Sequence, residues 1–130
     1  METKKAEATR EIEALKLLLP AERDAYKRLA ASAMRYYRLL KQLEIGHWDT
    51  AADLQQLSDL RECEDEAIFV EPKHMDLWYL FRQEASNTKS DADKAAPDPA
   101  ALKDVWSRHQ RQLYLHWDEF MNEARHHLTG

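Results

Sequence analysis

Pairs of glutamate and histidine three residues apart are the feature of this sequence most directly suited to chemistry. The spacing occurs three times, at Glu44–His47, Glu71–His74 and Glu123–His126. Random placement of the same residue types predicts about 0.6 such pairs. Residues i and i+3 of a helix project from the same side, and Glu-x-x-His pairs on facing helices hold the metal ions of di-iron bundles. A metal site is therefore one hypothesis for this chain.

The local context of each pair narrows this hypothesis. Gly46 interrupts the helix between Glu44 and His47, and on the last predicted helix His127, not His126, falls on the apolar side. If successive helices alternate in direction, the start of the fourth and the end of the fifth meet at one end of the bundle. The residues predicted to converge there as a metal site are Glu71, His74, Glu123 and His127. In the alternative interpretation they are surface or core-edge side chains without a ligand role.

A row of basic residues lies opposite the apolar stripe of the second predicted helix. It consists of Arg23, Lys27, Arg28, Arg35, Arg38 and Lys41. Such a face can bind the phosphates of nucleic acid, with an affinity that falls as salt rises. It can also meet an acidic surface, including the acidic end of the third predicted helix in this chain or in another copy, or stay solvated. The net charge of −5 argues against a basic field over the whole protein, so these interpretations stay open.

The aromatic content suggests a surface for a partner. The chain has four tryptophans and five tyrosines, more than we expect a small bundle to bury completely. Trp and Tyr are favoured anchors at protein interfaces. We predict that Trp48, Trp78 and Tyr79 contribute to such an interface and that most other aromatic residues belong to the core.

Histidines also border the apolar stripe of the last predicted helix, at His109, His116 and His127. A histidine at such an edge usually packs its ring while its tip stays hydrated. Because histidine titrates near neutral pH, a pH-responsive contact is the alternative.

The glycine and cysteine contents exclude several classes of protein. Only Gly46 and Gly130 are present, which removes glycine-rich phosphate loops and the Gly-x-Ser-x-Gly turn of serine hydrolases. We predict that the chain is not an enzyme and needs no cofactor. The single Cys63 cannot form a disulfide within the chain and fits a reducing compartment. No signal peptide or membrane span is expected, so we predict a cytoplasmic protein without a membrane partner.

Helical periodicity accounts for most of the chain and predicts an all-α bundle of about five helices in a single domain, 1–130. A stripe from Tyr26 to Leu43 at alternating steps of three and four residues marks a long helix over 21–45. Proline is poorly tolerated inside helices, so Pro20 is expected to separate this helix from an earlier one over 4–19. Further helices are expected over 50–65, 72–86 and 99–128.

Two connecting segments complete the predicted fold. The strand-like stretch 67–71 has no partner run and is expected to be a buried connector. The polar segment 86–98 resembles a linker in composition, and we predict a mobile loop there.

Three hypotheses of function follow. The first is a small helical protein-interaction module, such as a regulatory subunit, adaptor or chaperone-like protein, that self-associates as a homo-oligomer. The second is a nucleic-acid-associated accessory protein that uses the basic face of helix 21–45. The third is a metal-binding helical bundle.

Overall fold

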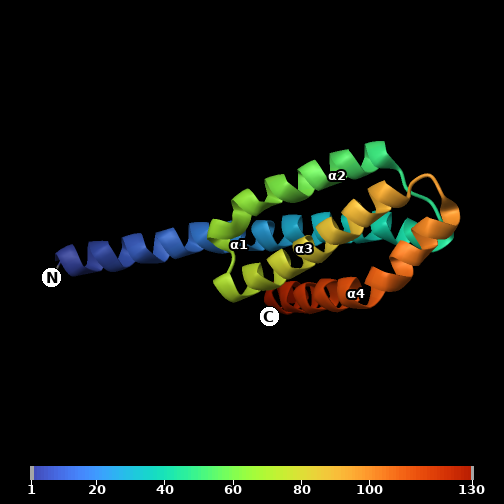
Figure 1. Ribbon diagram of the computed structural model, residues 1–130. Helices are drawn as coiled ribbons and strands as arrows, with labels where there is room; N and C mark the ends of the chain where they lie inside the picture. Colours follow the sequence, from blue (N-terminus) through green and yellow to red (C-terminus); the bar gives the residue numbers. More distant parts are fainter. Residues whose placement is uncertain (1, 130) are drawn as a thin grey trace.

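The computed structural model describes the backbone of residues 2–129 and the side chains of residues 20–129, and the all-α prediction is confirmed (Figure 1). Four α-helices run alternately in opposite directions. They are α1 (Glu2–Lys41), α2 (Thr50–Glu62), α3 (Pro72–Ala95) and α4 (Pro99–Thr129). Two 3-10 segments, η1 (Gln42–Ile45) and η2 (Cys63–Phe69), lie between them. Residues 67–69 of the strand-like stretch belong to η2, and no strand occurs within residues 2–129. The predicted buried connector is wrong for most of this stretch, because no residue of η2 is buried and Ile68 is 83% exposed.

The predicted break at Pro20 is wrong, because α1 continues through this residue as one helix of 40 residues. Proline holds φ near the helical value, so its ring removes one backbone hydrogen bond without forcing the chain out of the helix. The number of α-helices is therefore four instead of about five.

The turn after α1 is closed by Gly46, as its position in the sequence indicated. Its φ is 74°, and its N–H donates to the carbonyls of the preceding 3-10 segment. A Cβ atom at this position would lie 2.9 Å from the Cβ of Pro99 at the start of α4, so the absence of a side chain also permits close packing. Asp49 then caps α2, with its carboxylate accepting from the Ala52 N–H at 3.0 Å.

Two acidic residues of η2, directly after α2, pair with basic residues of two neighbouring helices. Glu64 accepts from Arg82 of α3 at 2.9 Å and from the Trp78 indole N–H at 3.3 Å. Glu66 pairs with Arg28 of α1. These contacts offset the repulsion between carboxylates and the negative end of the helix dipole, so this end is not left unpaired.

The predicted mobile loop over 86–98 is wrong for most of its length, because α3 extends to Ala95. The segment is polar, but Ala85, Thr88 and Ala92 recur on one face and are buried. The Thr88 hydroxyl donates to the Glu84 carbonyl at 2.8 Å. Small residues at helical spacing thus seat a segment whose composition resembles a linker, and only residues 96–98 connect it to α4.

A histidine joins α3 to α4 near this end of the bundle. The two ring nitrogens of His109 lie 2.9 Å from Glu84 and 2.7 Å from Asp91. Burial opposes the charged form of the imidazole, but these two carboxylates outweigh it and raise the pKa of His109. Arg108 also lies 3.6 Å from Asp91, so the carboxylates face positive charge on α4.

A buried polar network ties α1, α2 and α3 together at the same end. Asp53 of α2 is fully buried and accepts from the Tyr36 hydroxyl at 2.6 Å. Its other oxygen lies 3.2 Å from the ammonium of Lys89. Lys89 also pairs with Asp93 at 2.6 Å. Asp93 in turn accepts a hydrogen bond from the Trp48 indole N–H at 2.9 Å. Burial, followed by the bond to Asp53, raises the pKa of Tyr36.

The remaining core is apolar and is shared by all four helices. Tyr26, Leu29, Tyr36 and Leu40 of α1 are fully buried, as are Trp78 and Phe81 of α3 and Phe120 of α4. Of the described helices, none is apolar over a length that would cross a bilayer.

Candidate metal centre

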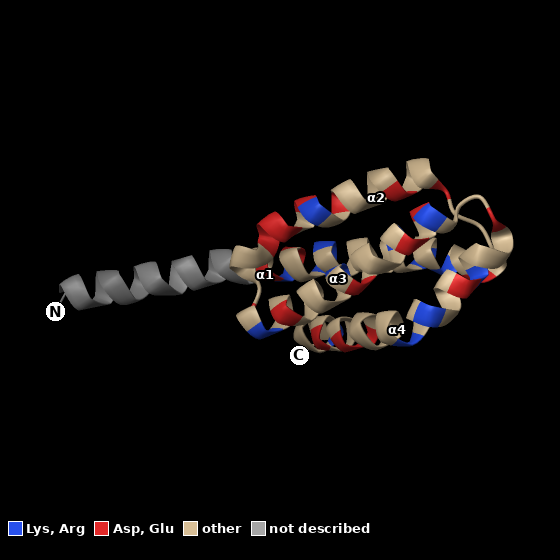
Figure 2. Ribbon diagram, viewed as in Figure 1, with Lys and Arg blue, Asp and Glu red and all other residues tan. Residues whose placement is uncertain are grey.

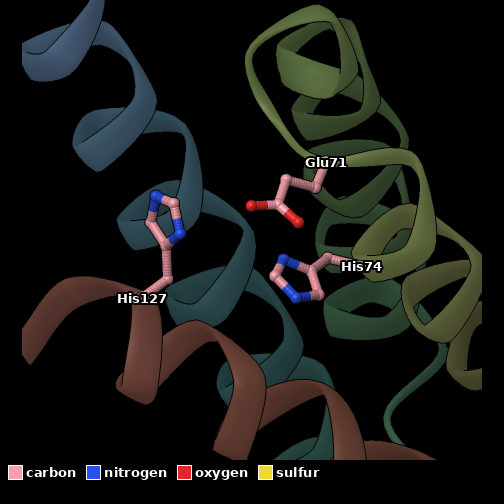
Figure 3. Close-up of side chains that lie close together, drawn as sticks. All are labelled: Glu71, His74 and His127. Carbon is pink, nitrogen blue, oxygen red and sulfur yellow. The ribbon is translucent and has the colours of Figure 1, made fainter. Parts of the chain in front are cut away.

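Three helices meet where α3 begins and α4 ends, and they bring together two histidines and a carboxylate (Figure 3). Pro72 opens α3, which places Glu71 at its N-cap and His74 in its first turn. His127 lies in the last turn of α4. One donor atom from each of Glu71, His74 and His127 can be chosen so that all three lie within 4.8 Å of one another.

The outward nitrogen of each histidine lies near a second carboxylate. Nε2 of His74 is 3.3 Å from Glu123, and Nε2 of His127 is 3.8 Å from Glu22. Figure 3 shows one nitrogen of each ring turned toward Glu71, and for His74 the nitrogen opposite Glu123 is Nδ1, which contacts the Tyr26 hydroxyl at 2.6 Å. Ligating histidines in metalloproteins commonly donate their other N–H to a carboxylate, which fixes the tautomer and orients the ring.

Tyr26 of α1 contacts all three of these residues and is fully buried. Its hydroxyl oxygen lies 2.6 Å from Nδ1 of His74 and accepts from the Glu71 backbone N–H at 3.2 Å. Its ring stacks on His127 with the centroids 4.0 Å apart. Burial, the largest influence, raises the pKa of Tyr26, which keeps a phenol in contact with the imidazole nitrogen.

The centre combines a buried side with an accessible one. His74 is only 5% exposed, whereas the Glu71 side chain is half exposed and also lies 3.4 Å from the ammonium of Lys73. An ion from solvent can therefore reach Glu71 first and then the two rings. Three carboxylates, Glu22, Glu71 and Glu123, surround the site and favour a cation.

Three of the four residues predicted to converge come together, because the helices alternate in direction as expected. Glu123 lies behind His74 instead of facing Glu71 and His127. Sequence reasoning missed Tyr26, which was assigned to the core stripe, and Glu22. The available signal was their spacing, since Glu22 lies one turn before Tyr26 on the same helix. Metal binding itself stays a prediction.

The predicted basic face is present on α1 but is partly met by acid from the same chain. All six of its residues are exposed: Arg23, Lys27, Arg28, Arg35, Arg38 and Lys41. Figure 2 shows acidic segments at the end of α2 close to α1. Arg28 and Arg35 line a groove of about 750 Å³ whose other walls include Asp59, Glu62, Asp65 and Glu66. This arrangement matches the interpretation in which the basic face meets the acidic end of the third predicted helix in this chain.

The predicted interface aromatics divide into buried and exposed residues. Trp48 is 9% exposed and Trp78 is fully buried, so these two are wrong as anchors for a partner. Their rings pack in the core, and each indole N–H is satisfied there by a partly exposed carboxylate, that of Asp93 for Trp48 and that of Glu64 for Trp78. Tyr79 is exposed, with the guanidinium of Arg82 5.3 Å from its ring centre.

An aromatic groove between α1 and α4 lies apart from the metal centre. Tyr37, Trp106 and Tyr114 line it, and its volume is about 520 Å³. Tyr37 stacks on Trp117 with the centroids 4.6 Å apart. Within the described part of the chain, the buried indole N–H groups of Trp106 and Trp117 have no hydrogen-bond partner. The rest of the groove's lining is polar and consists of Lys41, Glu44, Gln110 and Arg111.

Comparisons with protein-family models, with curated proteins and with solved structures found no match. Function has to be inferred from the residues and their geometry.

Proposed function

We propose that this protein is a helical bundle that binds one transition-metal ion between α1, α3 and α4. The observation that carries the proposal is the cluster of Glu71, His74 and His127, whose donor atoms lie within 4.8 Å of one another. The two carboxylates near the outward nitrogens support it, because ligating histidines commonly have a carboxylate at the ring nitrogen that does not bind the metal. The proposal assigns binding and no catalytic step.

The donor set suits first-row metals. Two imidazoles and one carboxylate hold zinc in hydrolases and iron in non-haem oxygenases. With bonds of roughly 2.1 Å, ligand atoms around a tetrahedral ion are about 3.4 Å apart. The three donors must therefore draw together by about an ångström. Glu71 precedes the first turn of α3 and His127 belongs to the last turn of α4, positions from which side chains can adjust.

The test compares metal binding by two neighbouring histidine variants. His127→Ala removes a proposed ligand, whereas His126→Ala removes an exposed histidine beside it. We expect untagged protein and the His126→Ala variant to bind one Zn²⁺ or Co²⁺ per chain by titration calorimetry and elemental analysis. The His127→Ala variant should bind at least about tenfold more weakly, with an unchanged helical circular dichroism spectrum. Equal binding by the two variants, or no binding by the wild type, would refute the proposal.

A second function, self-association as an interaction module, has support at a different place. Tyr114 and Leu115 of α4 are 52% and 45% exposed, and Tyr114 continues into the aromatic groove between α1 and α4. Exposed tyrosine beside an aromatic groove is typical of protein contacts. We propose a second copy of this chain as the occupant of this surface.

Mass in solution tests this second proposal. We expect light scattering to show a dimer or larger assembly for the wild type and a monomer for Leu115→Asp. The matched control is Leu54→Asp on α2, a leucine 60% exposed that should leave the assembly intact. A wild type that stays monomeric at high concentration would exclude self-association through this surface.

A further inference from the structure

The Tyr26 hydroxyl lies where it could itself bind a metal ion held by His74. Its oxygen lies 2.6 Å from Nδ1 of His74, and the lone pair of this nitrogen is the one that a metal ion would use. A metal at His74 must displace the phenolic proton from this contact. The oxygen then remains beside the metal, because the Tyr26 ring is held against His127.

We propose that Tyr26 is the fourth ligand and that the centre takes ferric iron as a tyrosinate complex. The inference rests on the metal-binding function proposed above. Ligand atoms in neighbouring positions of a six-coordinate ion with bonds of about 2.1 Å lie roughly 3 Å apart. The observed 2.6 Å between the Tyr26 oxygen and His74 Nδ1 is close to that spacing, so the oxygen needs little movement.

The charge of the surroundings selects a trivalent ion over a divalent one. Glu71 and the Tyr26 phenolate supply two anionic oxygen ligands, and the carboxylates of Glu123 and Glu22 stand behind the histidines. Hard oxygen donors and excess negative charge favour a hard, highly charged cation. Tyrosinate is an established iron ligand in haem proteins.

Binding of ferric iron removes a proton from Tyr26 and does not change the oxidation state of the iron. The O–H bond of Tyr26 breaks, an iron–oxygen bond forms, and the proton passes to the solvent buffer. His74 Nδ1 exchanges the phenolic hydrogen bond for a bond to iron, while its Nε2–H stays directed at Glu123. Metal binding therefore releases one proton from Tyr26.

The test is the colour of the ferric protein. Iron(III) supplied as a citrate chelate to metal-free, untagged protein should give one bound iron per chain. A phenolate-to-iron charge-transfer band should appear in the visible spectrum. Tyr26→Phe should abolish the band and weaken binding at least about tenfold, and Tyr79→Phe, at an exposed tyrosine, should preserve both. Resonance Raman spectra of the wild type should show phenolate vibrations, a readout that stands even if Tyr26→Phe fails to fold.

The outcomes separate this inference from the function on which it rests. A wild type that binds Zn²⁺ or Co²⁺ but not iron(III), or that binds iron without the band, overturns the tyrosinate ligand alone. A charge-transfer band that persists in Tyr26→Phe also overturns Tyr26 as a ligand. A wild type that binds none of these ions overturns the metal centre as well.

Discussion

The carboxylate behind His74 gives the sharpest test of how the centre is built. Glu123→Gln keeps the shape of the side chain and removes its charge, 3.3 Å from Nε2 of His74. We expect the affinity for Zn²⁺ to fall, because the imidazole loses the anion that makes Nδ1 a better donor and holds the ring in place.

The magnitude follows from the distance and exposure of this contact. Loss of an outer carboxylate typically weakens metal binding by about 10- to 100-fold. The Glu123 side chain is 49% exposed, so water replaces part of its effect and the low end applies. The expected loss is about tenfold, or about 1.4 kcal/mol. Glu22 lies 3.8 Å from His127, beyond hydrogen-bond distance, so Glu22→Gln should weaken binding by less than about fivefold.

Competition with a chromophoric chelator measures these differences directly. Glu119→Gln, at an exposed position one turn before Glu123 on α4, is the matched control and should bind like the wild type. Wild-type affinity in Glu123→Gln would show that this carboxylate does not support His74. A larger loss in Glu22→Gln than in Glu123→Gln would contradict the order of the two distances.

Three further predictions concern the opposite end of the bundle. Asp53→Ala should lower the free energy of unfolding by about 3 kcal/mol in urea denaturation, because it leaves the buried Tyr36 hydroxyl without its acceptor and removes one of the two carboxylates that pair with Lys89. His109→Gln should destabilise the protein more at about pH 6 than at about pH 8.5. The reason is that the pKa of His109 is raised in the folded state, so the stability that its charged form contributes is present below about pH 6.5 and is lost as pH rises through the folded pKa. Gly46→Ala should lower the melting temperature, with at least about 1–2 kcal/mol lost from the positive φ alone and more from the approach to Pro99.

Each of these predictions has a contrasting outcome. Glu62→Ala, at an exposed position of α2, should change stability by less than about 0.5 kcal/mol, so equal effects at 53 and 62 would exclude the buried network. A His109→Gln effect independent of pH would show that the imidazole is not charged in the folded state. A neutral Gly46→Ala would mean that the turn relaxes away from Pro99.

The sequence predicted the helical class and the convergence of the metal residues because both depend on local rules. Apolar periodicity marks helices, and alternation of short-linked helices places the start of α3 beside the end of α4. The prediction was wrong at Pro20, where the φ of proline is compatible with a continuing helix, and over 86–95, where tertiary packing overrides a linker-like composition. Thr88 illustrates the reason: it reads as a linker residue, yet it is fully buried once its hydroxyl bonds the preceding turn.

Tyr26 shows a second limit of what can be predicted from the sequence. Its place in the apolar stripe correctly predicted burial, but periodicity carries no information about which groups are buried with it. The hydroxyl meets His74, 48 residues later, only because α1 and α3 pack at one register. A polar end on a core aromatic is therefore a signal that becomes specific only when the facing helix is known.

The position of the centre implies that metal binding adds to a fold that exists without it. The buried polar network and the core aromatic residues are shared among α1 to α4, so the chain has the means to fold without metal, unlike small zinc domains. The proposed ligands Tyr26, Glu71, His74 and His127 come from three segments far apart in sequence, so we expect an ion to bind the native state much more tightly than the unfolded one. At 100 times the dissociation constant, such an ion adds about 2.7 kcal/mol to stability. A centre that is dispensable for folding but accessible to solvent fits a protein that holds or senses metal better than one that needs metal as a structural link.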